Sequence, residues 1–385
     1  MSVVALVVNC GLPQRSDERL WWLFWAAVPG LGITALRQLL AAFGSLQAAW
    51  AASPQALRAL PGFGEARLAA IAHHRARWGS DPLSAWCAAA GRGLGCLLPN
   101  DPACPQAVVA LPRPPLALYW RGRGSIWAPL RQRLAVAVVG TRRPSVHGLA
   151  MAEAIGMALA DAGWPVVSGL AEGIDAAVHQ GCLRAGGRPV AVLGTALDRV
   201  YPRHHQVLQQ QVGRAGLLIS EQAPGTGVLA GHFAARNRLQ VALAGALVLV
   251  ECPRRSGALH AARMARDAGL PVWVVPADAA KPSAAGSNAL LAQDAAPLLA
   301  AADLVHALGP GPLARVGVAA KPPACTVSAP SAAARALLAA VGSGASLLQL
   351  SQRLGQASAE LLPQLLALEL AGLLRAEPGL CWRPA

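Results

Sequence analysis

Short apolar runs recur at a regular interval through the middle of the chain, and this spacing constrains the fold more than any other feature. Six such runs begin near Ala135, Pro165, Pro189, Gly216, Gly245 and Leu270. The interval of about 25 to 30 residues is the length of a strand–helix–strand unit. The runs Ala135–Val139 and Val190–Leu193 are apolar on both faces, as strands covered by helices on both sides must be. The spacing therefore predicts an α/β fold with a doubly wound, mostly parallel, Rossmann-like sheet.

Helical segments are predicted on either side of this sheet. Near the N-terminus, the turns Val28–Gly32 and Leu60–Gly64 share a hydrophobic-x-Gly-hydrophobic-Gly pattern, and each precedes an apolar helix. The repeated turn resembles the helix-hairpin-helix module, in which backbone N–H groups at a helix N-terminus face a phosphate. A helical domain that keeps the turn for packing alone is the alternative. Apolar residues at helical spacing after Pro330, followed by a short hairpin, suggest a winged-helix-like domain. We predict four regions: a helical domain (helix-hairpin-helix or SAM-like) at 1–95, a Rossmann-like domain at 96–308, a linker at 309–330 and a winged-helix-like domain at 331–385.

Basic side chains outnumber acidic ones along the chain. The sequence has 33 Lys and Arg against 19 Asp and Glu, a net charge of +14. This excess favours a polyanionic partner, because Arg pairs bidentately with phosphate. The eight cysteines include no C-x-x-C pair and none lies near His at zinc-finger spacing, so we expect no metal. No apolar run reaches the roughly 20 residues of a membrane span, and the N-terminus lacks a basic leader, so we expect a cytosolic protein without a membrane partner.

Glycines and polar residues follow the predicted strands at the points where the strands end. In an open parallel sheet, ligands bind beyond the carboxyl ends of the strands, where helix N-termini gather. Gly140–Arg142 combines a residue that permits close backbone approach with a cation for phosphate. Ser168–Gly173 follows the second strand, Gly194 follows the third, and Arg236–Arg238 is expected to open a helix. A tight turn with a helix cap explains any single loop, but together the loops predict phosphate binding along one edge of the sheet.

Acidic side chains in the same loops are predicted to anchor them. Asp175 is expected to cap the N-terminus of a helix and to form a hydrogen-bonded pair with His179, one turn later. Asp198, Glu221 and Glu251 are assigned the same structural, loop-anchoring role. The G-x-G-x-x-G fingerprint is missing and no acidic residue ends the second strand, so we expect no dinucleotide or other cofactor. Because no nucleophile–base pair stands out, we predict no catalytic residue and no enzymatic activity.

Residues from about 97 to 300 resemble the DprA/Smf family of DNA-processing proteins. The motifs that carry the resemblance are, in order, Val138–Arg142, Ser168–Asp175, His179, Ala191–Gly194, Leu197–Asp198, Tyr201–Pro202, Ser220–Glu221, Pro224–Thr226, Phe233, Arg236–Arg238, Glu251 and Ser256–Gly257. The resemblance implies a protein that binds single-stranded DNA, protects incoming strands in natural transformation and helps load a RecA-type recombinase, usually as a homodimer. The family pattern implies DNA contacts at Arg142 and at the basic residue after Tyr-Pro, which is Arg203 here.

With the family resemblance, the predicted phosphate-binding loops become a predicted nucleic-acid-binding site. The nucleic-acid-binding residues are predicted to be Gly140, Thr141, Arg142, Ser168, Gly169, Gly173, Gly194, Arg203, Arg236, Asn237, Arg238, Ser256 and Gly257. Departures stand at Ala234, Leu239–Ala242, Ala258, His260 and Ala277. We expect them to leave the phosphate loops intact and to alter the sheet edge that forms the family's dimer and pocket wall.

Two other functions stay open at the level of sequence. Rossmann-like folds include nucleotide N-glycosidases, and Glu172, Glu221 and Glu251 are candidate acids or bases for an enzyme that acts on nucleoside monophosphates. The second alternative is a recruitment scaffold, whose terminal modules bind partner proteins while the sheet binds nothing.

Overall fold

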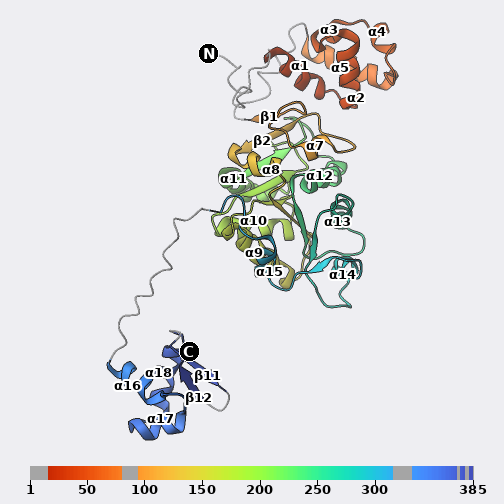
Figure 1. Cartoon of the computed structure of the whole chain (residues 1–385). Helices are drawn as coiled ribbons and strands as arrows, with labels where there is room; N and C mark the ends of the chain where they lie inside the picture. The colour runs from red at the N-terminus through yellow and green to blue at the C-terminus, as the bar shows by residue number, and fades with distance from the viewer. Residues whose placement is uncertain (1–15, 80–93, 315–331, 371–372, 378–380, 385) are drawn as a thin grey trace. The chain divides into compact units, whose positions relative to one another are not determined.

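The structure is a computed structural model that describes residues 16–79, 94–314, 332–370, 373–377 and 381–384 (Figure 1). Its contacts divide the chain into two compact units, Met1–Ala314 and Arg315–Ala385, and each unit is described by itself. The N-terminal segment examined for a signal peptide and most of the predicted linker at 309–330 lie outside the described residues. In the described ranges, no helix combines the length and the apolar character needed to cross a bilayer.

A nine-stranded sheet forms the centre of the larger unit, in the order β1-β2-β6-β5-β4-β3-β7-β8-β9. The strands are β1 Gly95–Leu97, β2 Leu118–Gly122, β3 Val136–Val139, β4 Val166–Ser168, β5 Pro189–Leu193, β6 Leu217–Ser220, β7 Ala246–Leu249, β8 Val272–Val274 and β9 Ala296–Pro297. Strands β3 to β9 pair in parallel, while β1 and β2 are antiparallel additions beside β6. The chain winds outward from β3 to β6, then returns to the other side of β3 with β7. The predicted doubly wound sheet is thereby confirmed, and its switch point lies between β3 and β7.

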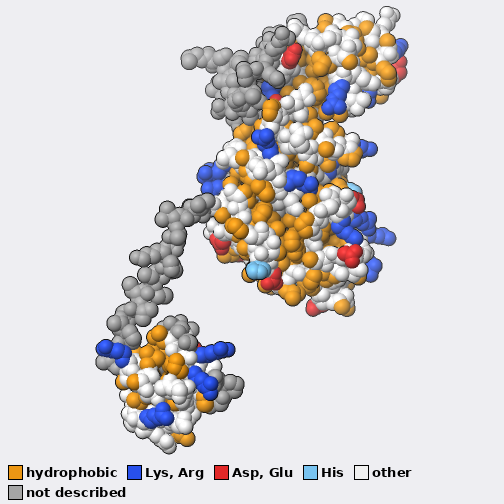
Figure 2. Space-filling model, in the orientation of Figure 1, with side chains coloured by type: hydrophobic (Ala, Val, Ile, Leu, Met, Phe, Trp, Pro, Cys, Tyr) orange, Lys and Arg blue, Asp and Glu red, His pale blue; other side chains and the backbone are white. Residues whose placement is uncertain are grey.

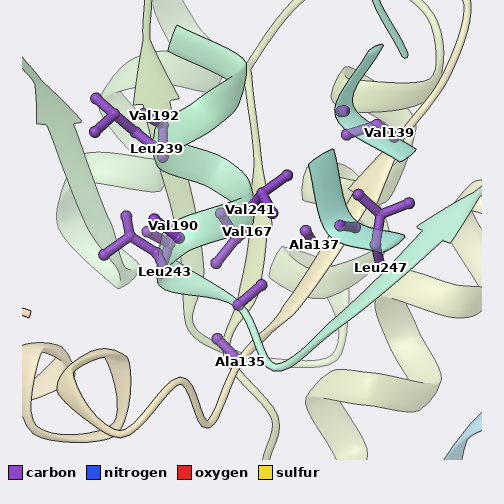
Figure 3. Close-up of a cluster of buried hydrophobic side chains, with 14 of the residues drawn as sticks. Ala135, Ala137, Val139, Val167, Val190, Val192, Leu239, Val241, Leu243 and Leu247 are labelled. Atoms are coloured by element: carbon purple, nitrogen blue, oxygen red, sulfur yellow. The ribbon is translucent and has the colours of Figure 1, made fainter. Parts of the chain in front are cut away.

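Helices cover both faces of this sheet. Those of the sheet region are α7 Gln106–Val109, α8 Trp127–Arg131, α9 Val146–Asp161, α10 Ile174–Arg184, α11 Gln206–Ala215, α12 Ala230–Leu243, α13 Gly257–Asp267, α14 Ala285–Leu291 and α15 Ala301–Leu308. Successive side chains of a strand point to opposite faces. Val136 and Val138 of β3 pack in a core with α9 and α10, whereas Ala137 and Val139 pack in another with α12 and α13 (Figure 3). Every residue of β3 is therefore buried, which is why its sequence reads as an unbroken apolar run.

Helices α9 and α10 approach each other closely through two glycines. A Cβ atom on Gly156 would lie 3.0 Å from the backbone nitrogen of Cys182, and one on Gly181 would lie 2.9 Å from the carbonyl carbon of Glu153. In both cases a carbonyl oxygen lies closer still. Because backbone atoms cannot swing aside as a side chain can, both positions need glycine. The two helices therefore form one tightly packed layer, and their N-termini lie together at the carboxyl edge of the sheet.

The two outermost strands of the sheet are short. At one margin, β1 contributes three residues, paired antiparallel with β2. At the other, β9 contributes two residues and ends in Pro297, which has no backbone N–H to donate. Neither margin of the sheet therefore presents a long row of free backbone groups.

Short helices precede the sheet in the sequence. They are α1 Ser16–Ala26, α2 Ile33–Phe43, α3 Leu46–Ala51, α4 Pro54–Arg58 and α5 Glu65–Trp78. Gly30 and Gly62 have φ angles of +78° and +76°, and Gly32 and Gly64 are the N-caps of α2 and α5, both with ψ of 177°. The two turns that repeat in the sequence therefore also repeat in backbone geometry. Their assignment to a helix-hairpin-helix module that binds DNA stays a prediction.

The described residues of the smaller unit form three helices and a three-stranded antiparallel sheet. The elements are α16 Ala332–Val341, β10 Ala345–Ser346, α17 Leu347–Leu354, α18 Ser358–Leu370, β11 Leu374–Glu377 and β12 Cys381–Pro384. The strand order is β10-β12-β11. Helix α17 begins in a capping box, in which Ser346 and Gln349 exchange side-chain and backbone hydrogen bonds. The predicted winged-helix-like class and the predicted domain boundaries stay predictions.

Candidate functional site

Four loops and one helix meet at the carboxyl edge of the large sheet. The loops follow β3, β4, β5 and β7, and α12 enters with its N-terminal half. The nitrogen of Ile174 donates to the oxygen of Thr141 at 3.2 Å, and a Cβ atom on Gly173 (φ +76°) would lie 2.5 Å from that oxygen. A Cβ atom on Gly140 would lie 2.5 Å from Cγ1 of Ile174. The glycines at these strand ends therefore allow the first two loops to interlock.

The side chain of Arg236 reaches across the end of β4 and is buried there. Its Nη1 donates to the carbonyl of Val192 in β5 at 2.5 Å, and 5% of the residue is exposed. Gly169, the first residue after β4, makes room, because a Cβ atom at that position would overlap the guanidinium. Asp175 lies within electrostatic reach of Arg236, and its Oδ2 accepts from the nitrogens of Gly169 at 3.1 Å and Ala171 at 3.4 Å. The buried charges thereby hold α12, the loop after β4 and α10 together.

Burial is the largest influence on the pKa values of Asp175, Arg236 and His179. Burial raises the pKa of the Asp175 carboxyl, and the Arg236 charge and the backbone donors oppose that rise. Burial also lowers the pKa of Arg236, which Asp175 opposes and Arg142 reinforces. A guanidinium nevertheless keeps its proton at physiological pH. Burial lowers the pKa of His179 to about 3, with the charges of Arg236 and His205 adding to the shift, so His179 is neutral.

Three local predictions in this region are wrong. The N-cap of α10 is Gly173, and Asp175 lies in the first helical turn, because its carboxylate bonds back to the loop rather than forward along the helix. Asp175 and His179 do not form a hydrogen-bonded pair, since neither ring nitrogen of His179 has a partner in the described part of the chain. Arg236–Arg238 lies in the middle of α12, which begins at Ala230.

An arginine and two aromatic rings, Arg142, Tyr201 and Phe233, form a cluster that we call the aromatic corner. The ring centroids of Tyr201 and Phe233 lie 4.8 Å apart, and Cζ of Arg142 lies 5.8 Å from the centroid of Phe233. Gly194 supports the corner, because a Cβ atom there would lie 2.7 Å from Cδ1 of Phe233. Arg142 is exposed and Tyr201 is 43% exposed. The corner therefore offers a cation for phosphate beside ring faces on which a base can stack.

Glu251, at the end of β7, anchors the start of α9. Its Oε2 accepts from the nitrogen and the hydroxyl of Ser145 at 3.1 and 2.7 Å, and its Oε1 accepts from the hydroxyl of Ser283 at 2.5 Å. Lys281 Nζ lies 3.7 Å from Oε1. Burial by itself raises the pKa of Glu251, but these hydrogen bonds and the Lys281 charge outweigh it, so the pKa lies below its ordinary value. The carboxylate thereby occupies the helix N-terminus at which many Rossmann-like folds bind a phosphate.

Three other predicted residues lie in the neighbouring loops. Arg203 is exposed in the short helix η3 (Arg203–His205). Oδ2 of Asp198 accepts from the nitrogen of Gly225 at 3.1 Å, as expected of a loop anchor. Glu221 forms an ion pair with Arg238, with 2.5 Å between Oε2 and Nη2. Arg238 is therefore neutralised within the chain, whereas Arg203 faces solvent.

The side chains of the remaining predicted residues, Asn237, Ser256 and Ser168, form hydrogen bonds with backbone atoms. Nδ2 of Asn237 donates to the carbonyl of Gly257 at 3.1 Å, which ties α12 to the first residue of α13. Ser256 is the N-cap of α13 and accepts from the nitrogen of Ala258. Ser168 is fully buried, and its hydroxyl donates to a β3 carbonyl. Ser168, like the buried Arg236, is therefore placed to support the loops rather than to meet a ligand.

The departure at Leu239–Ala242 does not lie on an edge of the sheet, so that part of the expectation is wrong. All four residues are buried in the C-terminal half of α12, where the helix packs against the face of the sheet. Ala277 follows β8, and its nitrogen and oxygen both bond to the side chain of Asn288, at 3.2 and 2.9 Å. Neither change reaches the aromatic corner.

Sequence reasoning did not assign a DNA contact to four exposed or partly exposed side chains that the structure brings to this edge: Tyr201, Phe233, Arg254 and Arg255. The composition could have pointed to Tyr201 and Phe233, because the chain has only 4 Phe and 2 Tyr, and two of these stand directly beside predicted loops. No comparable signal marks the arginines, because arginine is common throughout the chain.

The carboxylates proposed for an enzyme each lie beside a different basic side chain. Oε1 of Glu172 lies 3.5 Å from Nε2 of His204, Glu221 pairs with Arg238, and Glu251 lies beside Lys281. Among the residues that the structure describes, no group of three or more His, Cys, Asp or Glu is arranged to hold a metal ion. The arrangement favours binding of an anion over acid–base chemistry.

Comparison with known proteins gives a consistent result. The family model described as DNA recombination-mediator protein A matches residues 95–309. A Smf protein from Synechocystis sp. is 36% identical over 300 residues, which cover 78% of this chain and 75% of that protein. A DNA processing protein DprA from Bacillus subtilis is 31% identical over 195 residues, covering 51% of this chain and 65% of that protein.

Two solved structures are similar to this chain. DNA processing protein A from Streptococcus pneumoniae has a TM-score of 0.61 at 24% identity, covering 76% of this chain and 98% of that one, and shows the likeness of fold. DNA processing protein A from Helicobacter pylori, solved for its mode of binding single-stranded DNA, has a TM-score of 0.50 at 28% identity, covering 56% and 95%.

Proposed function

This chain belongs to the DNA recombination-mediator protein A family, and from that premise we propose that it is a non-catalytic protein that binds single-stranded DNA at the carboxyl edge of its large sheet. A solved relative from Helicobacter pylori binds single-stranded DNA. The net charge of +14 suits a polyanion, because each cation that meets a phosphate releases a counterion.

The aromatic corner is the observation that carries this proposal. Arg142 and Phe233 stand 5.8 Å apart, so one nucleotide can place its phosphate on the guanidinium and its base against the ring. A single strand exposes the faces of its bases, whereas a duplex hides them in the stack. The corner therefore favours single-stranded over double-stranded DNA.

The buried pair of Arg236 and Asp175 supports this site from below. Arg236 lies three residues after Phe233 in α12, within one helical turn. Its contacts with Val192 and Asp175 hold that helix over β5 and β4. Preorganisation of this kind lowers the entropy that binding must lose. We assign Arg236, Asp175 and Ser168 this supporting role, and we assign DNA contact to Arg142, Arg203 and the loop glycines.

The partners form the finer part of the proposal. The family description names a recombination mediator, and on that ground we propose a RecA-type recombinase as the partner that this protein loads onto incoming strands in natural transformation. Protection of those strands, a cytosolic location and a homodimer belong to the same proposal. The buried position of Leu239–Ala242 supports it, because the departures there change no exposed surface. Recombinase filament formation on DNA coated with a single-strand-binding protein tests the loading.

The DNA-binding proposal is tested by fluorescence anisotropy with matched single- and double-stranded oligonucleotides across a range of salt. We expect tighter binding of the single strand. Arg142→Ala should reduce the slope of log affinity against log salt by about 0.7, which is roughly 5-fold in affinity at about 0.1 M salt. Arg131→Ala is the control, because Arg131 is an exposed arginine that precedes β3 at the opposite edge. Equal binding of both DNA forms, or equal loss from both variants, would contradict the proposal.

A further inference from the structure

Four exposed arginines stand in the two loops on either side of the switch point. Arg142 and Arg143 follow β3, and Arg254 and Arg255 follow β7. Strands β3 and β7 are neighbours, paired from Val136 with Ala246 to Val139 with Leu249, so the two loops leave the sheet side by side. Within the described ranges, no carboxylate lies at ion-pair distance from any of the four. Figure 2 shows that Lys and Arg also outnumber Asp and Glu over the visible face.

In the described part of the chain, no carboxylate neutralises these four charges. Each pair stands just before a helix: Arg142 and Arg143 before α9, and Arg254 and Arg255 before α13. The N-terminus of a helix carries a partial positive charge, so cations there are unfavourable. By contrast, Arg131, Arg184, Arg214 and Arg266 stand where a helix favours a cation, in the last turns of α8, α10, α11 and α13. The four arginines of the switch point are therefore free to pair with an external anion.

Between the two loops, the N-terminus of α9 is not available to a small anion. The buried carboxylate of Glu251 already accepts the nitrogen and hydroxyl of Ser145 at the start of α9. A phosphate cannot take the same donors, and it stays above them, within reach of the exposed guanidinium groups. A surface of this kind fits a chain of phosphates that passes over the switch point, rather than a single nucleotide that enters it.

The start of α13, directly after the loop that follows β7, is also fixed relative to the aromatic corner. Asn237 of α12 donates to the carbonyl of Gly257 at 3.1 Å, and the same helix carries Phe233 one turn earlier. The helix that carries Phe233 is therefore bonded to the residue that directly follows the loop of Arg254 and Arg255, which favours simultaneous contact of both with one ligand.

We propose that Arg254 and Arg255 form a second phosphate-binding surface, across the switch point from Arg142 and Arg143, over which the backbone of the bound single strand continues. The inference rests on the proposed function and extends it, because it assigns a path to the bound strand. The path runs from the aromatic corner, over Glu251, towards α13. Arg143 lies between the two ends of this path and contributes to it.

The test compares two double variants of the full chain that remove the same charge. Arg254→Ala with Arg255→Ala removes the proposed surface, and Arg131→Ala with Arg214→Ala removes two exposed arginines near helix C-termini at the amino edge. Binding to a single-stranded oligonucleotide of about 20 nucleotides is measured by anisotropy across salt. The first variant is expected to reduce the salt slope by about 1.4, or roughly 25-fold in affinity at about 0.1 M salt. The control variant is expected to keep the wild-type slope.

The outcomes separate this inference from the function on which it rests. If the wild type shows no specific binding of single strands, or if Arg142→Ala binds them as the Arg131→Ala control does, the proposed function fails. If Arg142→Ala weakens binding while the Arg254 and Arg255 variant keeps the wild-type slope, the function stands and the second surface is refuted. Equal slopes for the two double variants also refute it, because the effect is then one of net charge. The melting temperature without DNA should not fall in the Arg254 and Arg255 variant, since it removes repulsion at a helix N-terminus.

Discussion

Gly181→Ala tests whether the close contact between α9 and α10 holds the larger unit together. A Cβ atom at Gly181 would lie 2.9 Å and 3.0 Å from the carbonyl carbon and Cα of Glu153, and closer still to its oxygen. Ordinary contact begins at 3.4 Å, so the two backbones must part by at least 0.5 Å, the difference between 3.4 and 2.9 Å. The move is resisted along the whole pair, because the residues between the helices and the sheet are buried.

Two opposing effects determine how much Gly181→Ala lowers the free energy of unfolding. Overpacking of a core costs about 1 to 3 kcal/mol, and the upper end applies here because the atoms met belong to the backbone. Replacement of glycine by alanine inside a helix returns up to about 1 kcal/mol. The net loss is therefore about 2 kcal/mol, which corresponds to a fall in melting temperature of roughly 4 to 8 °C for a domain of this class.

Differential scanning calorimetry of the full chain measures this shift in the transition of the larger unit. Gly231→Ala is the matched control, because Gly231 lies in α12 with nothing within 4 Å of its added Cβ atom. The control is expected to leave the melting temperature unchanged or to raise it slightly. If Gly181→Ala melts within about 1 °C of Gly231→Ala, where the structure demands roughly 4 °C or more, the close contact does not exist in solution.

Two further predictions address the site. Phe233→Leu is expected to weaken binding of single-stranded DNA by about 1 to 3 kcal/mol per stacked base while leaving the salt slope unchanged; anisotropy across salt measures both, and a reduced slope would mean that Phe233 acts through Arg142. His179→Leu is expected to reduce the loss of stability between pH 7 and pH 5 by about 2 kcal/mol, because the buried ring has its pKa lowered from 6.5 to about 3, so the unfolded chain alone takes up a proton as the pH falls below 6.5. Urea unfolding at the two pH values checks this, and an unchanged difference would show that His179 titrates freely in the folded protein.

The sequence was a good guide to the strands because most of them are buried on both faces. The run Ala135–Val139 is apolar throughout, and the structure places it in the middle of the sheet. The start of α12 was harder to predict. Its first half faces the loops and its second half is buried, so the apolar positions of Ala230–Leu243 follow no single helical stripe. The two residues of β9 are too few to leave a pattern at all.

For the site, topology predicted which loops meet but not which side chains turn inwards. Arg236 reads in the sequence as an exposed cation, and only the missing Cβ of Gly169 and the charge of Asp175 explain its burial. Both partners are distant in sequence, and the fold alone brings them near. Phe233 was recognised as part of a motif, but its role depends on Gly194 and Tyr201, which pack against it from another loop.

The short margins of the large sheet bear on how copies of this chain can meet. An open sheet whose outer strand is long and unpaired invites strand addition, and with it domain swapping and aggregation. Here one margin is three residues long, and the other is two residues long and ends in proline. Through these two described margins, two copies cannot merge their large sheets into one over any useful length. Self-association of this unit therefore has to use side chains on its helices and loops, where single substitutions can tune it.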